Sequence, residues 1–490
     1  MTLPPGWAWT TLGEVATLVG GGTPSRERPD YFTGHIVWLT PTEIPKDRVA
    51  VILDSRERIT EEALRKSSAR LVPKDTVLMT SRASIGYVAI AGTDVSTNQG
   101  FASFICEAGV HNSYLAYWLW ANADHFIEKA TGTTFKEITK SKLRLFAFPL
   151  APLPEQRRIV AKLEELVTRL DAGVAALKDV RAKLKRYKAA VLKAASEGRL
   201  VPQDPNDEPA SQLLQRILAE RKAKWEADLR ARGKDPSKAK YVEPKPPDAD
   251  RLPELPSRWC WATLNQLSWD AGYGTSQKCD YEASGPPVLR IPNIVNGGFD
   301  LSDTKYATNG NALADTDALA PGDLLIIRTN GSKDLIGRTG LVRETFDPPH
   351  FFASYLIRYR ILDLYLAAWL SAIWDASSNR RKIEQIAATS AGQYNVSVSS
   401  LNRITVPIPP LTEQFRIVAE VERRLSVVQE LEGAVAASLA RAGRLRQAIL
   451  KRAFEGKLVP QDPSDEPASV LLQRISMSRS EPIAPNSSKT

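Results

Sequence analysis

Two segments of this chain are nearly identical and lie 258 residues apart. Residues 197–217 read EGRLVPQDPNDEPASQLLQRI and residues 455–475 read EGKLVPQDPSDEPASVLLQRI, with 18 of 21 positions identical. The same offset already holds upstream, where PLPEQ at 152–156 is matched by PLTEQ at 410–414. A long internal repeat predicts a molecule built from two similar halves.

Each half begins with a pair of tryptophans, Trp7 and Trp9 in the first and Trp259 and Trp261 in the second. We interpret these four as packing residues, because each pair lies beside an apolar run at the start of a domain. Short apolar runs between Gly, Pro, Asn and Asp then predict strands and turns, and residues 112–130 and 362–376 read as helical. We expect two similar α/β domains, at 1–150 and 257–408.

A different kind of sequence follows each expected domain. Between residues 155 and 196 the only Gly or Pro is Gly173, and apolar residues recur every three or four positions. The second copy repeats this spacing, which predicts a long helix whose apolar seam must be buried against a partner helix. A straight helix of 43 residues would be about 64 Å long. We place the two spacer helices at 151–200 and 409–456.

The remaining segments are predicted to be connections. Gly198 and Gly456 are typical helix stops, and Pro202 and Pro460 follow them. Residues 201–256 read as a turn segment and a charged, proline-rich linker, with one short helix near 208–230. Residues 457–490 hold the repeated C-terminal segment and a polar tail, from Ser476, which we expect to be disordered.

Composition limits the class of protein. A formal net charge of +9 is compatible with a polyanionic partner, nucleic acid first. We see no apolar run of about 18 residues and no signal peptide, so no membrane partner is expected. The three cysteines are scattered without metal-ligand spacing, which argues against disulfides and a bound metal and favours the cytoplasm.

Motifs for catalysis are few. The segment DPPH at 347–350 approaches a methyltransferase signature, but His replaces its aromatic residue and no glycine-rich cofactor loop accompanies it, so we interpret it as a turn. The glycines at 20–22 lack the Lys-Ser/Thr ending of a phosphate-binding loop. We therefore expect a binding protein with no catalytic residue, and the basic run at 178–188 reads as a solvated helix face.

Polar loops in the two expected domains are the candidate DNA-binding sites. Arg suits guanine edges, Asn and Gln suit adenine edges, and Ser, Thr and Lys serve phosphates. The alternative for each such residue is a role in its own turn. The candidates in the first domain are Ser81, Arg82, Ser84, Thr97, Asn98 and Gln99. The candidates in the second domain are Thr275, Gln277, Lys278, Arg328, Thr329, Asn330, Ser332, Lys333, Gln393 and Asn395.

Taken in order, these motifs resemble those of the specificity subunits of type I restriction–modification systems. The similar segments are the Trp-x-Trp-x-Thr-Leu openings, GGTP at 21–24 with WLTP at 38–41, SRASIG at 81–86 with TNQG at 97–100, PGDLL at 321–325, both PLxEQxxIV helix starts, and the repeated G(R/K)LVPQDP segment. The resemblance covers nearly everything except the linker and the tail.

The resemblance implies an α+β protein with two target-recognition domains, separated by two helices packed as an antiparallel coiled coil with a pseudo-two-fold repeat. Each domain would bind one half of an asymmetric site in double-stranded DNA, with the halves about one duplex turn apart. Two methylation subunits and restriction subunits would be its partners. S-adenosylmethionine, ATP and Mg would be bound by those partners, and no cofactor by this chain.

Two other functions stay open at this point. A stand-alone DNA methyltransferase has only residues 347–349 in its favour. A coiled-coil scaffold without sequence-specific DNA binding explains the helices, but it gives no reason for two diverged, loop-rich domains.

Overall fold

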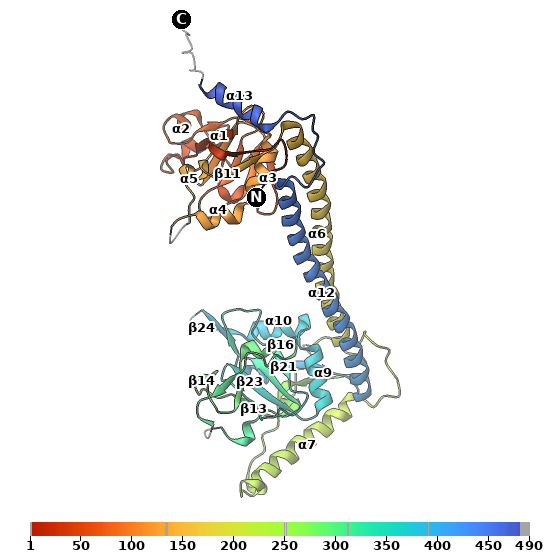
Figure 1. Cartoon of the computed structure of the whole chain (residues 1–490). Helices are drawn as coiled ribbons and strands as arrows, with labels where there is room; N and C mark the ends of the chain where they lie inside the picture. Colours follow the sequence, from red (N-terminus) through yellow and green to blue (C-terminus); the bar gives the residue numbers. More distant parts are fainter. Residues whose placement is uncertain are drawn as a thin grey trace. The chain divides into compact units, whose positions relative to one another are not determined.

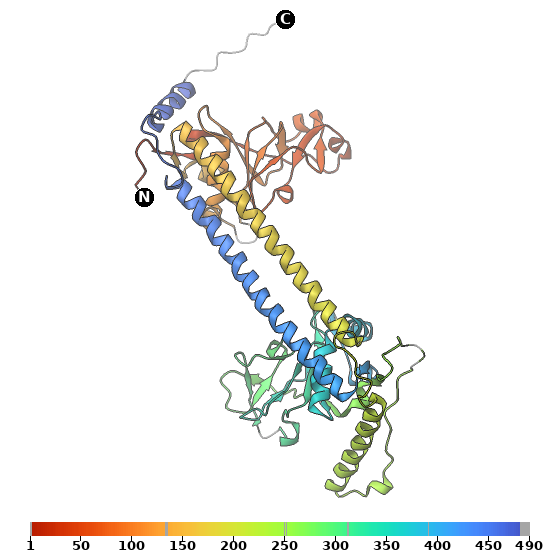
Figure 2. The ribbon, with the colours of Figure 1, turned by 90° about the vertical axis from the view of Figure 1, so that its right-hand side faces the viewer.

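The structure is a computed structural model that describes residues 2–480 except 133–135, 249, 251, 311, 312 and 391. The chain divides into two compact units, Met1–Lys178 with Ala436–Thr490, and Asp179–Val435. Helices α6 (Leu153–Ser196) and α12 (Leu411–Phe454), each of 44 residues, run from one unit into the other (Figures 1 and 2). Each unit therefore holds one globular domain and a part of each helix.

The first domain is built on two sheets that share no strand. The larger has the order β2-β10-β7-β8-β4, formed by Ala16–Gly20, Phe101–Cys106, Val77–Thr80, Val88–Ala91 and Ala50–Ile52. The smaller has the order β5-β3-β9-β6, formed by Glu57–Ile59, Ile36–Leu39, Val95–Thr97 and Leu71–Val72. Strands β1 (Ala8–Thr11) and β11 (Ala147–Leu150) pair where the chain enters and leaves the domain. The helices are α1 (Leu12–Val15), α2 (Glu61–Arg65), α3 (Asn112–Ala121), α4 (Ala123–Lys129) and α5 (Lys140–Arg144).

The second domain repeats this plan. Its main sheet has the order β13-β23-β19-β21, formed by Ser268–Tyr273, Leu356–Ile361, Asp323–Ile327 and Thr339–Leu341. Its second sheet has the order β14-β18-β15-β22, formed by Cys279–Asp280, Lys305–Ala307, Pro287–Leu289 and Phe351–Phe352. The smaller strands are β12 (Cys260–Thr263) with β26 (Thr405–Ile408), β16 (Ile294–Val295) with β17 (Gly298–Phe299), and β20 (Thr329–Asn330) with β25 (Gln393–Asn395) and β24 (Ala388–Ser390). Its helices are α8 (Leu264–Leu267), α9 (Leu364–Trp374), α10 (Ser377–Ile386) and α11 (Val398–Leu401).

The spacer helices α6 and α12 are antiparallel in each unit. In the first unit, Ile159 and Leu163 near the start of α6 share a hydrophobic core with Leu450 and Phe454 at the end of α12. In the second unit the end of α6 shares a core with the start of α12 in the same way, through residues that include Leu192 and Ile417. Burying one such side chain contributes about 1.5–3 kcal/mol. The predicted fold class, two α/β domains with an antiparallel coiled coil, is confirmed.

The repeated segment has a second role besides ending the spacer helices. Gly198 and Gly456 stop the helices with φ of +66° and +67°, as the sequence predicts. The chain then forms α7 (Ala210–Ala231), which contributes Ile217 to the core of the second unit, and α13 (Ala468–Ser480), which contributes Leu471 to the core of the first. Each repeated segment therefore packs on the domain that precedes the other spacer helix.

The sequence prediction for the C-terminal tail needs one correction. Residues 476–480, which we expected to be disordered, continue the helix α13 that starts at Ala468. Arg479 fixes this end of the helix, since its Nη1 donates to the Gly13 carbonyl at 2.7 Å and its Nη2 forms an ion pair with Glu107. The rest of the predicted tail, residues 481–490, lies outside the described residues.

Truncating Leu471 should destabilise the first domain although it lies more than 300 residues away in sequence. Leu471 is 6% exposed, and Leu→Ala at a buried position costs about 2–5 kcal/mol. We expect Leu471→Ala to accelerate hydrogen exchange in β10 and α3 and to leave α9 unchanged. Met477→Ala, at a position 68% exposed on the same helix, is the matched control. Equal exchange in the two variants would contradict the packing described above.

Candidate nucleic-acid interface

A buried hydrogen bond joins each domain to its spacer helix. Trp7 Nε1 donates to Glu155 Oε2 at 2.9 Å, and Trp259 Nε1 donates to Glu413 Oε2 at the same distance. Burial raises the pKa of both carboxyl groups, and the tryptophan N–H opposes this rise. The interpretation of Trp7 and Trp259 as packing residues is confirmed, since they are 8% and 7% exposed.

An ion pair links each repeated segment to the start of a spacer helix, close to the Trp–Glu hydrogen bond. We call this combination of contacts the joint. Arg158 Nη2 lies 2.6 Å from Asp465 Oδ2, and Arg416 Nη2 lies 2.7 Å from Asp207 Oδ2. Burial alone would raise the pKa of Asp207, but hydrogen bonds from Arg416 and Thr412 lower that pKa below its ordinary value. Arg158 and Arg416 are 258 residues apart, and so are Asp207 and Asp465. The two joints are therefore built from equivalent residues of the repeat.

The polar loops of the first domain are held together by backbone hydrogen bonds. The Gly22 N–H donates to the Thr97 carbonyl at 2.8 Å, and the Asn98 N–H donates to the Leu39 carbonyl at 3.0 Å. The Ser81 N–H donates to the Gly100 carbonyl at 2.8 Å. A Cβ atom on Gly21 would collide with two carbonyl oxygens of the 97–98 segment, so only glycine allows this close approach.

The second domain has the same frame of three main-chain hydrogen bonds. The Thr275 N–H donates to the Phe352 carbonyl at 2.8 Å, and the Ala353 N–H donates to the Leu289 carbonyl at 2.9 Å. The Arg328 N–H donates to the Tyr355 carbonyl at 2.9 Å. Each of these bonds corresponds to one in the first domain, because it joins the ends of the equivalent strands. For example, Gly22 follows β2 and Thr97 ends β9, while Thr275 follows β13 and Phe352 ends β22. One frame of main-chain bonds therefore presents a loop cluster in each domain.

The frame also fixes the residue that follows the central strand. The Ser81 carbonyl, directly after β7, accepts from the Ile138 N–H at 2.9 Å. The Arg328 carbonyl, directly after β19, accepts from the Val396 N–H at 3.0 Å, and Val396 lies 258 residues after Ile138. Ser81 and Arg328 are therefore equivalent positions whose backbones make the same two bonds.

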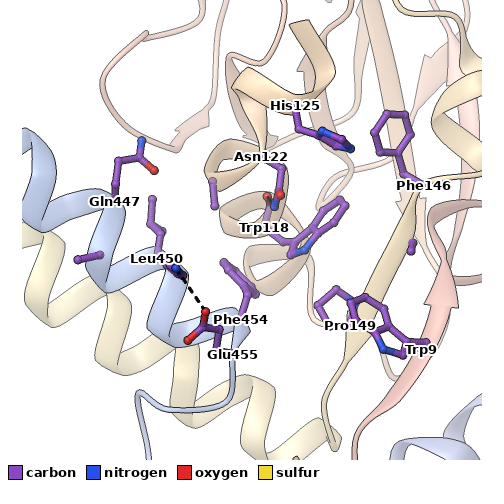
Figure 3. A pocket seen from close by; sticks show the side chains of 14 residues that line it. Trp9, Trp118, Asn122, His125, Phe146, Pro149, Gln447, Leu450, Phe454 and Glu455 are labelled. Atoms are coloured by element: carbon purple, nitrogen blue, oxygen red, sulfur yellow. Dashed lines mark hydrogen bonds and ion pairs between the residues drawn. The ribbon is translucent and has the colours of Figure 1, made fainter. Parts of the chain in front are cut away.

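The first unit also contains a cavity of about 620 Å³, which lies between the first domain and the end of α12 (Figure 3). Nothing in the sequence indicated this cavity. Trp9, Trp118, Phe146 and Phe454 line it, and Trp9 is 48% exposed, so this tryptophan is not a fully packed residue. In the second unit the equivalent tryptophan, Trp261, donates its Nε1 hydrogen to the Pro253 carbonyl of the linker at 3.1 Å. Because this lining is mostly aromatic and apolar, it does not suit a polyanion, and the cavity is not part of the candidate nucleic-acid interface.

Comparisons with known proteins agree with this architecture. Residues 4–177 match the family model of the type I restriction modification DNA specificity domain. Over nearly its whole length the chain is similar to the EcoKI specificity subunit of Escherichia coli strain K12, with 25% identity over 97% of this chain and 96% of that one. Over nearly its whole length this chain is therefore similar to type I restriction–modification specificity subunits.

Further relatives and a solved structure extend the comparison. The StySPI specificity subunit of Salmonella potsdam is 24% identical over 97% of this chain and 96% of its own length. The MjaIX specificity subunit of Methanocaldococcus jannaschii is 35% identical over 32% of this chain and 37% of its own. A solved chain from work on complex assembly in the type I R-M system shares the fold, with a TM-score of 0.59 and 21% identity over 93% of this chain and all of that chain. These similarities support the interpretation as a DNA-specificity subunit over a scaffold or a stand-alone methyltransferase.

The predicted site residues of the first domain meet in one cluster but differ in exposure. Ser81 and Thr97 are buried, at 5% and 2% exposed, so their side chains contribute to the frame. Asn98 is used locally, since its Oδ1 accepts from the Gly100 N–H at 2.8 Å. Ser84 is half-buried, while Arg82 and Gln99 are exposed. Arg82 Nε lies 3.9 Å from Glu137 Oε2. Arg82 and Gln99 present the most accessible polar groups of the cluster.

The predicted residues of the second domain also form one cluster. Lys278, Ser332, Lys333 and Gln393 are exposed, and Thr275, Gln277, Arg328, Thr329, Asn330 and Asn395 are half-buried. Asn330 Oδ1 accepts from the Ser332 N–H at 2.8 Å, which is a turn contact. Thr329 pairs with Asn395 across β20 and β25, so these two loops lie side by side. Contact of any of these residues with DNA stays a prediction.

Other groups that could carry chemistry lie apart from these clusters. His350, in the segment interpreted as a turn, is 7% exposed, and its Nδ1 lies 2.7 Å from the Pro348 carbonyl oxygen. Within the part of the chain that the structure describes, no group of three or more His, Cys, Asp or Glu is placed to hold a metal ion. No helix in that same part is long and apolar enough to cross a membrane.

Proposed function

We propose that this chain is a specificity subunit that reads a split, asymmetric DNA site, one half with each domain. The observation that carries the proposal is the shared backbone frame, which presents different side chains in the two domains. A common frame would place both loop clusters against a duplex in the same way. The different side chains, such as Arg82 in the first domain and Arg328 in the second, would then select different bases.

The spacer helices would set the distance between the two half-sites and carry the partner proteins. Two methylation subunits and restriction subunits are the partners we propose, in the cytoplasm. S-adenosylmethionine, ATP and Mg would be bound by those subunits. The net charge of +9 on this chain would favour association with a polyanion.

Selection from a pool of random duplex DNA tests this function. We expect the chain with its methylation subunits to enrich two short sequence blocks separated by a gap of fixed length. Non-specific binding should weaken steeply with salt, because each phosphate contact releases counterions. A pool in which no sequence is enriched at any salt concentration would overturn the proposal. Calorimetry of the chain alone with S-adenosylmethionine should show no binding.

A further inference from the structure

The position that directly follows the central strand carries different side chains in the two loop clusters. Ser81 and Arg328 make equivalent main-chain bonds, yet one side chain is a buried hydroxyl and the other a guanidinium. Since the frame fixes the backbone at this position, the fold leaves the side chain free to vary. Such a position can change specificity without changing structure.

The Arg328 side chain is held in one place. Its Cζ lies 4.5 Å from the centre of the Tyr273 ring, a cation–π contact, and its Nη1 donates to the Ser354 carbonyl at 3.3 Å. The Tyr273 ring is itself tied down, because its hydroxyl accepts from the Val398 N–H at 3.3 Å. A guanidinium that is already fixed loses little conformational entropy when it binds a ligand.

Several polar side-chain atoms of this cluster are buried without a hydrogen-bond partner in the described part of the chain. Among the residues that the structure describes, Arg328 Nε, Gln277 Oε1 and Asn395 Oδ1 are buried and have no hydrogen-bond partner. Folded proteins leave few such atoms unpaired. Tyr273 and Tyr355 beside them are 48% and 55% exposed. Unpaired polar atoms and exposed aromatic rings in one cluster indicate a site that a bound molecule completes.

The other cations of this cluster are less suited to reading a base. Lys333 Nζ lies 3.7 Å from Glu384 Oε2, and Lys278 is exposed, so both suit contact with phosphates. Arg328 is the only arginine among the predicted residues of this cluster, and no described residue accepts from its Nη2. Two parallel N–H groups match the O6 and N7 acceptors of guanine.

We propose that Arg328 reads a guanine in the half-site bound by the second domain. This inference rests on the proposed function and adds the identity of one base. Ser81, at the equivalent position, has no such donor pair, so the first domain selects its bases with other side chains.

The test is a set of Arg328 variants in the full chain with its methylation subunits. We expect Arg328→Ser, which installs the side chain type of the first domain, to relax selection at one G·C pair. Arg328→Lys should relax it as well, because a flexible ammonium lacks the fixed planar pair of donors that the guanidinium presents. Affinity for the original site should fall about tenfold to a hundredfold, because one bidentate base contact is lost. Sequencing of methylated DNA and competition binding measure both effects.

Lys333→Ala is the control, with weaker binding to all sequences and an unchanged motif expected. Unchanged unfolding temperature and hydrogen exchange would show that the Arg328 variants fold. The inference is overturned if these variants keep the wild-type motif, if they lose affinity equally for every sequence, or if the second half-site contains no G·C pair. In each case the wild-type chain would still select a split motif, which separates this failure from failure of the proposed function.

Discussion

Exchanging residues 12–146 for those of another specificity subunit should replace one half of the recognised site and leave the other half unchanged. These limits retain Trp7, β1 and β11, and so retain the joint between Trp7 and Glu155. The loop cluster of the first domain is held by bonds within that domain, and the second cluster by its own. We expect a complete change of bases in one half-site, because every predicted contact of that half is exchanged.

Sequencing of methylated sites in cells that carry the hybrid measures the outcome. The reciprocal exchange, residues 264–404, should change the other half only and serves as the matched control. The incoming domain must accept Leu471 and Ile475 of α13, which belong to the core of the first unit. A hybrid that alters both halves, or neither, would contradict independent reading.

The spacer helices were the most predictable part of the fold. Their apolar spacing and their glycine stops are local features, so the sequence predicts a spacer helix at 151–200, and α6 extends from Leu153 to Ser196. The α+β character of the domains was equally accessible from short apolar runs between turns. The helix predicted near 208–230 extends from Ala210 to Ala231.

The packing of the repeated segment could not be read from local pattern. The ion pair between Arg158 and Asp465 joins residues 307 positions apart, and no periodicity reports such a contact. The loop clusters were predictable in composition but not in arrangement. Main-chain hydrogen bonds bring the loops together. These bonds do not depend on the polar side chains from which the loops were predicted to bind DNA.

The equivalence of Ser81 and Arg328 illustrates the same limit. The two domains differ by six residues in length, so a single sequence offset does not align these positions. Their relation becomes visible through bonds to Ile138 and Val396, which lie in the part where the offset of 258 holds.

Lengthening both spacer helices should lengthen the gap between the half-sites. We would insert seven residues between Lys178 and Asp179 in α6 and seven between Val435 and Ala436 in α12, where the two units meet in sequence. Seven residues preserve the heptad phase of the seam and add about 10 Å at 1.5 Å per residue. At about 3.4 Å per base pair, the distance alone corresponds to roughly three base pairs. A duplex series with gaps of every length would show the new optimum.

Inserting four residues into α6 alone is the contrasting variant. Four residues turn the helix by about 400°, so the apolar seam leaves its register by about 40° and no longer faces α12. Residues such as Leu163 and Leu192 pack within different units, and a one-sided insertion cannot keep both pairings with α12. We expect binding of the split site to fall more than tenfold with this variant, while the paired seven-residue insertion retains it at a longer gap. An unchanged gap in the paired variant would contradict the role of the spacer helices as the element that sets spacing.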